Sequence, residues 1–397
     1  MPRVPGRPFL QIPGPTNTPL RVLAAIAQPT IDHRGPTFQK LARSVLERIR
    51  GVFGTTQPVI IYPASGTGAW EAALVNTLSP GDRILMAETG HFATLWSRMA
   101  RRLGLDVDLL PGDWRSGVDA ARIEAQLRAD GERRIRAVAV VHNETSTGVT
   151  SDIAAVRRAI DRAGHPALLL VDTISSLGSI DYRHDEWGVD VTVGGSQKGL
   201  MLPPGLSFNA VSPTARAASA TAGMPRAFWD WEEMLASNDK GFFPYTPSTN
   251  LLQGLAVALD MLEEEGMDAV FRRHLRAADA VRRCVRHWGF DIQAADLREA
   301  SAALTAVRLP AGYSADALRA TILDQSSVSL GNGLGQLTDR VFRIGHLGDF
   351  NDPTLLGILA AIEMGLGACG IPHRSGGVES ALAALLGADT PTAAAAE

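Results

Sequence analysis

The sequence of 397 residues has few cysteines and no apolar stretch long enough to cross a membrane. Its two cysteines, Cys284 and Cys369, are far apart, so they predict neither a disulfide framework nor a metal site. Residues 1–10 contain Arg3 and Arg7 but lack the apolar core of an export signal. The formal net charge of −4 gives no reason to expect a nucleic acid or a membrane surface as partner. We therefore expect a cytoplasmic protein without a metal ion.

Lysine is also scarce in this sequence. Of the 38 basic residues, only Lys40, Lys198 and Lys240 are lysines, so the other 35 are arginines. Arginine is always charged, whereas a buried lysine can lose its proton and attack a carbonyl carbon. A lysine that is kept in such a sequence is therefore a candidate for chemistry that arginine cannot perform. Because Lys40 falls in a helical pattern and Lys240 in a polar loop, the candidate is Lys198.

Short apolar segments alternate with segments of helical periodicity over residues 35–211. Two of the apolar segments, Ala137–Val141 and Ala167–Val171, contain no polar residue, which is typical of strands that are buried on both faces. The alternation predicts an α/β fold with a mainly parallel sheet and helices on both of its faces. Ligands of such folds bind beyond the carboxyl ends of the strands.

The pattern divides the chain into four parts. The proline-rich start predicts an extended arm over residues 1–20, and the alternating pattern predicts a large domain over residues 21–260. A long helix is expected over residues 251–288, and the strands and helices around and after it predict a small α+β domain over residues 261–385. The alanine-rich end, residues 386–397, is expected to be frayed.

Three polar clusters follow apolar segments of the large domain. Residues 64–68, Ala-Ser-Gly-Thr-Gly, can hold a phosphate on free helix amides, and an ordinary strand–helix turn is the alternative. Asp172 directly follows a buried strand, so its carboxylate needs a cation such as a protonated pyridine nitrogen; an Asp that caps the next turn is the alternative. Lys198 lies in Gly-Gly-Ser-Gln-Lys-Gly after another strand, where it can approach a bound aldehyde.

A fourth candidate, Arg343, lies in the small domain between the apolar residues Phe342 and Ile344. A buried guanidinium is costly unless it meets an anion, and a bidentate bond to a substrate carboxylate is a common reason for it. An internal salt bridge is the alternative.

Taken in chain order, these motifs resemble the sequence pattern of the class V aminotransferases, and the resemblance extends over nearly the whole chain. No single motif is specific, but the ordered set is. The motifs that carry it are Ser65–Thr67, His142–Gly148, Val171–Asp172, Gly195–Gly199 and Phe342–His346. Within the family, the chain is most similar to the bacterial serine–glyoxylate aminotransferases and to their alanine– and aspartate–glyoxylate relatives. Further segments that resemble this group are residues 13–17, 32–34, 185–190, 202–205 and 243–247.

The resemblance implies the fold-type I architecture with a seven-stranded, mainly parallel sheet, the cofactor pyridoxal 5′-phosphate (PLP), and a homodimer with active sites at its interface. Lys198 is implied to carry the cofactor and to act as base and then acid, Asp172 to pair with the pyridine nitrogen, and Arg343 to bind the substrate carboxylate. The other cofactor contacts that the resemblance implies are Thr145 and Phe92 at the ring, Ser65, Gly66, Thr67 and Gln197 at the phosphate, and Tyr245 or Thr246 at the phosphate of the partner subunit's site.

The implied reaction is transamination from a small L-amino acid to glyoxylate, which becomes glycine. L-Serine is the expected donor, with hydroxypyruvate as its product, while alanine and aspartate stay open. Thr173 departs from the Gly or Ser that relatives more often have, which leaves the fine substrate preference undecided. Residues Asp32–Arg34 fit a substrate pocket or a surface ion cluster equally well.

Three other functions are alternatives. A desulfurase would need a nucleophilic cysteine near Lys198. A non-catalytic scaffold would keep the fold without binding PLP. A nicotinamide dehydrogenase would need a GxGxxG fingerprint between a strand and a helix, which residues 64–68 do not provide.

Overall fold

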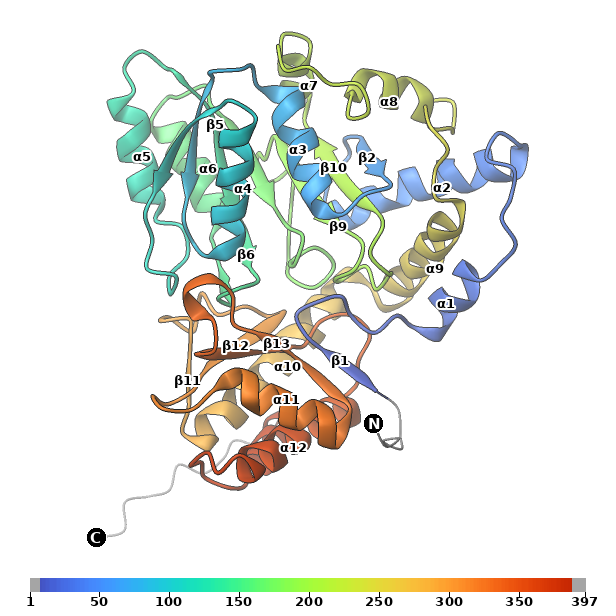
Figure 1. The fold of residues 1–397 in the computed structure, drawn as a ribbon. Helices are drawn as coiled ribbons and strands as arrows, with labels where there is room; N and C mark the ends of the chain where they lie inside the picture. Colours follow the sequence, from blue (N-terminus) through green and yellow to red (C-terminus); the bar gives the residue numbers. More distant parts are fainter. Residues whose placement is uncertain (1–7, 388–397) are drawn as a thin grey trace.

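The computed structural model describes residues 8–387, which form two large sheets and a two-stranded ribbon (Figure 1). In the seven-stranded sheet, β10 runs antiparallel to both of its neighbours and all other pairs are parallel. The mainly parallel sheet expected from the alternating pattern is therefore confirmed. Its strand order is β2 (Val59–Tyr62), β10 (Ser207–Val211), β9 (Val191–Gly195), β8 (Leu168–Asp172), β5 (Ile135–Val141), β3 (Arg83–Ala87) and β4 (Asp106–Leu110).

Helices cover both faces of this sheet because successive residues of a strand point to opposite sides. In β2, Ile60 and Tyr62 face one group of helices, Val59 and Ile61 face the other, and all four are buried. The first face carries α3 (Gly66–Thr77), α4 (His91–Arg102), α7 (Pro213–Ser219) and α8 (Trp231–Asn238). The second face carries α2 (Pro36–Phe53), α9 (Thr249–Glu265), α5 (Ala120–Ala129) and α6 (Ile153–Arg162).

The five-stranded sheet combines the C-terminal part of the chain with one strand from its start. Figure 1 shows the blue β1 beside the orange elements below the larger sheet. The strand order is β1 (Phe9–Gln11), β13 (Val328–Asn332), β14 (Val341–Gly345), β12 (Leu304–Arg308) and β11 (Asp291–Ile292). The helices that share its core are α10 (Met267–Trp288), α11 (Ala315–Ser326), α12 (Asp352–Ala368) and α13 (Gly377–Leu385).

The start of the chain, which was expected to be an extended arm, is joined to the smaller sheet by β1. Residues 1–7 lie outside the described part, but β1 pairs in parallel with β13, and α1 (Leu20–Ile26) begins where the arm was expected to end. The N–H and C=O groups of β1 find partners at the edge of the sheet, which a sequence pattern of only three residues does not reveal.

The prediction of one long helix over residues 251–288 was wrong, because this segment forms two helices. Gly266 adopts a φ of 81° between α9 and α10, a conformation that ends a helix and favours glycine. Since α9 packs on the larger sheet and α10 on the smaller one, we propose this break as the domain boundary. Of the end expected to be frayed, residues 388–397 lie outside the described part, and Leu386 and Gly387 follow α13 directly.

Candidate active site

The carboxyl ends of three neighbouring strands bring the predicted residues to one edge of the larger sheet. Asp172 is the last residue of β8, Lys198 follows β9, and the segment His142–Gly148 follows β5. These strands are adjacent and parallel, so their carboxyl ends lie side by side. Asp172 and Lys198 are both buried, with 4% and 7% of their surface exposed.

The carboxylate of Asp172 is held by two N–H groups. Its Oδ1 accepts a hydrogen bond from the backbone N–H of Ile174 at 2.7 Å, and its Oδ2 accepts one from Nε1 of Trp70 at 3.0 Å. Burial raises the pKa of Asp172 to about 7, although both hydrogen bonds act to lower it. The predicted alternative, an Asp that caps the next turn, therefore accounts for Oδ1, which accepts from the backbone, but not for Oδ2, which accepts from Trp70. The contact with Trp70 was not anticipated.

The side chain of Lys198 points toward the start of the chain. Its Nζ donates a hydrogen bond to the carbonyl oxygen of Pro13. Burial and, to a smaller extent, the nearby Arg343 lower the pKa of Lys198 to about 7, and Asp172 opposes this shift. A neutral amine is thus accessible at physiological pH. Lys40 and Lys240 are exposed.

Residues 12–16, the part of the expected arm that follows β1, lie against Lys198 and cover it. A Cβ atom on Gly14 would collide with the side chain of Lys198, and Gly14 has a φ of 87°, so only glycine fits without strain. Thr16 donates from its N–H to the carbonyl of Gln197 at 3.1 Å and from its hydroxyl to the carbonyl of Lys198 at 3.2 Å. The Pro-Gly-Pro-Thr sequence was the only signal of this cover.

The predicted phosphate cradle is the N-terminus of α3. Ser65 is the residue before the helix, its hydroxyl makes no capping bond, and Ser65 and Thr67 are exposed, whereas Gly66 is buried. A side chain on Gly66 would collide with Ile174, the residue whose N–H holds Asp172. Gln197 has a buried Oε1 atom without a hydrogen-bond partner among residues 8–387. The free helix N–H groups and these polar side chains suit an anion.

Arg343 of β14 reaches from the smaller sheet toward the larger one. Its Nη1 donates to the carbonyl of Thr145 and its Nε to the carbonyl of Asn332, both at 2.7 Å. Burial lowers its pKa to about 10, and Glu144 opposes this shift. No carboxylate within the described residues forms an ion pair with Arg343, so the predicted alternative of an internal salt bridge was not found there. The guanidinium retains further N–H groups that can bind an anion.

Glu144 is a buried residue of the site that sequence reasoning missed. Its carboxylate lies at the N-terminus of α4, where it accepts hydrogen bonds from the N–H of Phe92 at 3.3 Å and of Ala93 at 3.1 Å. The hydroxyl of Ser146 donates to it at 2.6 Å. This carboxylate thereby holds the first turn of α4, which carries Phe92, against the segment that carries Thr145.

The residues predicted to serve a partner subunit, Tyr245 and Thr246, lie between α8 and α9 in the chain. The hydroxyl of Tyr245 donates to the carbonyl of Ile61 at 3.0 Å, and its ring stacks on Phe228 with centroids 4.8 Å apart. The side chain of Thr246 is exposed. Residues Asp32–Arg34 form no ion pair within the described part of the chain, and Oδ1 of Asp32 accepts a hydrogen bond from the backbone N–H of Arg34.

Comparisons with known proteins decide the family. The family model "Aminotransferase class-V" matches residues 9–336. The chain belongs to the class V aminotransferases. It is 46% identical over 366 residues to the L-aspartate–glyoxylate aminotransferase of Paracoccus denitrificans, with 92% of each chain covered. It is 47% identical over 370 residues to the serine–glyoxylate aminotransferase of Methylorubrum extorquens, again with 92% of each covered.

A solved structure agrees with the sequence relatives of this aminotransferase. The pyridoxamine–pyruvate aminotransferase of Mesorhizobium loti superimposes with a TM-score of 0.89 at 28% identity, over 97% of this chain and 99% of that one. The family predicted from the ordered motifs is thus confirmed, and with it the fold-type I architecture.

Neither cysteine of the aminotransferase is placed as a desulfurase would need. Cys284 of α10 is fully buried in the core of the smaller sheet, where burial raises the pKa of its thiol. The Sγ atom of Cys369, at the end of α12, lies 3.3 Å from Oγ1 of Thr321 in α11. Among residues 8–387, no cluster of His, Cys, Asp or Glu could hold a metal ion, and no helix is long and apolar enough to span a bilayer.

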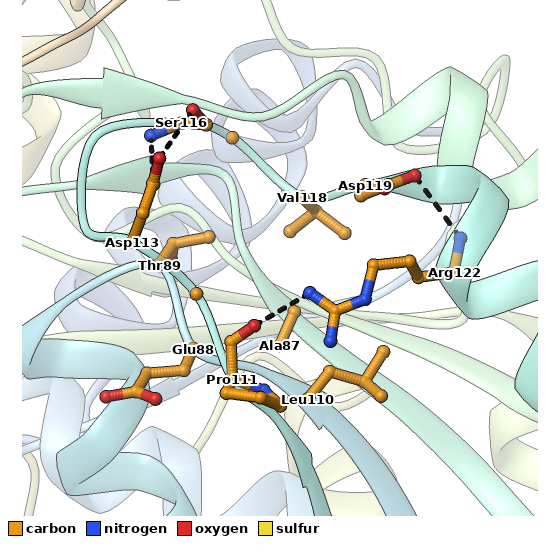
Figure 2. Close-up of a pocket in the computed structure, with 12 residues that line it drawn as sticks. Ala87, Glu88, Thr89, Leu110, Pro111, Asp113, Ser116, Val118, Asp119 and Arg122 are labelled. Carbon is orange, nitrogen blue, oxygen red and sulfur yellow. Dashed lines mark hydrogen bonds between the residues drawn. The ribbon is translucent and has the colours of Figure 1, made fainter.

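A separate pocket of about 430 Å³ lies at the carboxyl ends of β3 and β4 (Figure 2). Some of its polar groups are bonded within its wall, whereas the buried Oγ1 atom of Thr89 has no hydrogen-bond partner among the described residues. Asp113 accepts from the N–H groups of Arg115 and Ser116, and Arg122 donates to the carbonyl of Pro111 at 2.7 Å. None of the residues predicted to bind cofactor or substrate lines it.

Proposed function

We propose that this aminotransferase uses PLP to move the amino group of a small L-amino acid to glyoxylate, with L-serine as the donor. The products are then hydroxypyruvate and glycine. One observation carries the proposal: the buried Asp172 and Lys198 lie at the carboxyl ends of the neighbouring strands β8 and β9, and Arg343 bonds to the carbonyl of Thr145 in the loop after the adjacent β5. A lysine, a carboxylate and a guanidinium so arranged can hold a cationic ring and a substrate carboxylate around one reactive amine.

The described residues fit PLP. Asp172 is buried and bonded to two N–H groups but forms no ion pair within residues 8–387, and a protonated pyridine nitrogen would supply the cation. The free Ser65 hydroxyl and the unpartnered Oε1 of Gln197 are suited to a phosphate group. When bound, PLP supplies an electron-withdrawing ring that stabilises the negative charge left on the α-carbon of the substrate. The residues proposed to hold it are Asp172 at the ring nitrogen, Thr145 and Phe92 at the ring, and Ser65, Gly66, Thr67 and Gln197 at the phosphate.

Lys198 and Arg343 act on the substrate itself. With its pKa lowered to about 7, the amine of Lys198 can take a proton from the α-carbon of the substrate. As the resulting ammonium, Lys198 would then give the proton to the cofactor carbon that receives the amino group. Arg343 orients the substrate through its carboxylate. Glyoxylate offers little beyond that carboxylate for binding, so this contact contributes a large share of its affinity.

We further propose a cytoplasmic homodimer with active sites at the interface. Exposed leucines on α1 support an interface there, because Leu20 and Leu23 are 70% and 42% exposed. Since the hydroxyl of Tyr245 is bonded to Ile61 of its own chain, Thr246 is the residue proposed to reach the phosphate of the partner subunit's site.

The test is a single-turnover experiment with purified enzyme and PLP. Serine, alanine and aspartate are added in turn without glyoxylate, and the visible absorption band of the bound cofactor is followed in wild type, Lys198→Ala and Lys240→Ala. Lys240 is exposed and serves as the matched control. With serine, we expect the cofactor band to be lost in wild type and in Lys240→Ala but to persist in Lys198→Ala. A faster loss with aspartate or alanine would change the donor, and a wild type without any cofactor band would leave the scaffold alternative.

A further inference from the structure

Trp70 is the one aromatic side chain that bonds directly to Asp172 among the described residues. It lies in α3, is 3% exposed, and places its indole Nε1 3.0 Å from Oδ2 of Asp172. The other carboxylate oxygen is used by the backbone N–H of Ile174. The indole is therefore the only side-chain donor to this carboxylate within residues 8–387.

The orientation of the indole is fixed by a second tryptophan. The ring of Trp70 stacks on that of Trp96 in α4, with centroids 5.8 Å apart and an interplanar angle of 12°. Trp96 is fully buried, and its own Nε1 has no hydrogen-bond partner among the described residues. One ring of the pair thus donates to the carboxylate, while the other provides only packing.

We propose that Trp70 is a positioning residue for the cofactor: its indole N–H holds Asp172 in the orientation and ionised form that pair with a protonated pyridine nitrogen. The inference rests on the proposed function, since it assumes that PLP is bound. It adds a second role to α3. The same helix would hold the phosphate at its N-terminus, through Ser65 and Gly66, and the ring carboxylate one turn later, through Trp70.

The charges around Asp172 explain why this donor matters. Burial disfavours the carboxylate form, and Glu144 adds to this effect, whereas Lys198, Ile174 and the indole favour it. A hydrogen bond to an ionised group is stronger than one between neutral groups. Without the indole N–H, a larger fraction of Asp172 is protonated near neutral pH, and a protonated carboxyl cannot form an ion pair with a pyridinium.

The experiment compares Trp70→Phe with Trp96→Phe. Both changes remove an indole N–H and the same ring volume from one stacked pair, but only the first breaks a hydrogen bond. The dissociation constant of PLP is measured from pH 5 to pH 9 by absorbance titration of the apoprotein. We expect Trp70→Phe to weaken binding by about tenfold near neutral pH. We also expect its acid-side loss of affinity to begin at a higher pH than in wild type and Trp96→Phe.

Two results separate this inference from the proposed function. If wild type does not bind PLP, the proposed function itself fails. If wild type binds PLP and the two variants share one pH profile, only the role of Trp70 is overturned.

Should Trp70→Phe not fold, the indole N–H resonances of the wild-type apoprotein provide the test. We expect one of them to titrate with pH in wild type and to stop titrating in Asp172→Asn. Indole resonances that behave identically in the two proteins would overturn the proposal.

Discussion

Nη1 of Arg343 lies 2.7 Å from the carbonyl oxygen of Thr145, so the smaller sheet is bonded directly to the loop that follows β5 of the larger sheet. A second bond, from Nε to the carbonyl of Asn332, fixes the guanidinium on its own side. The side chain is therefore oriented before substrate arrives. The guanidinium forms no ion pair with a carboxylate of the described residues, so its charge is available to an anionic ligand.

Replacement of Arg343 by Ala is expected to lower kcat/KM for both the amino donor and glyoxylate. Loss of a buried charge-assisted contact costs about 2–4 kcal/mol, which corresponds to roughly 30- to 1000-fold. Steady-state kinetics with each substrate varied in turn measure this effect. Arg286→Ala is the control, because Arg286 is exposed on α10. If Arg343→Ala kept the wild-type kcat/KM for glyoxylate, another residue would have to bind the carboxylate.

Replacement of Gly14 by Ala is expected to displace Lys198. The new methyl group would meet the lysine side chain, and the φ of 87° adds backbone strain of about 1 kcal/mol. Gly81 is a matched control, because its φ is 84° and a Cβ atom there would meet nothing within 4 Å. Both variants should lose similar stability from strain, measured by thermal unfolding. Only Gly14→Ala should slow the single-turnover reaction, and equal rates for the two variants would argue against the arm as a cover for Lys198.

Replacement of Glu144 by Gln is expected to destabilise the protein by about 1–2 kcal/mol. The carboxylate accepts hydrogen bonds from the N–H groups of Phe92 and Ala93 and from the hydroxyl of Ser146. In Gln, an NH2 group replaces one of the two carboxylate oxygens, and this group cannot accept a hydrogen bond from them. Chemical denaturation measures the free energy of unfolding. Glu132→Gln is the control, since its side chain is 82% exposed. Equal stability of the two variants would show that Glu144 is not needed to hold α4.

The ends of the strands were predictable because their signal is local. Ala167–Val171 is an apolar run with an acid directly after it, and Gly194–Gly199 follows the segment Val189–Val193, in which valine recurs at every second position. Asp172 and Lys198 could therefore be assigned to one edge of a parallel sheet. The two buried strands could be recognised without knowing which segments pair with them.

The contacts that orient those residues were not predictable, since each joins segments that are distant in the sequence. In the sequence, Trp70 is indistinguishable from the other apolar residues of a helix face. Its bond to Asp172 follows only from the packing of α3 beside the end of β8. Likewise, Pro13 reaches Lys198 only because β1 pairs with β13, which returns the start of the chain to the site. Single-sequence patterns contain no information on such pairings.

Four buried histidines predict a loss of stability at mildly acidic pH. Burial lowers the pKa of His142, His184 and His274 to about 4 and that of His346 to about 3. In the unfolded chain a histidine titrates near 6.5, so the unfolded state binds more protons than the folded state below that pH. Their contribution is fully present above pH 6.5, falls by up to about 1.4 kcal/mol per pH unit for each group, and is lost once the folded pKa is passed.

A single variant isolates one of these groups. The Nδ1 atom of His184 lies 2.7 Å from the hydroxyl of Thr192, whereas Nε2 has no partner among the described residues. Asn can retain the first contact and does not titrate. Urea unfolding at steps between pH 7 and pH 4 should therefore give a shallower pH dependence for His184→Asn than for wild type, by up to one proton. His287→Asn, at a partly exposed position on α10, is the matched control. If His184→Asn kept the wild-type pH dependence, His184 would already be protonated in the folded protein, and its burial would not contribute to acid unfolding.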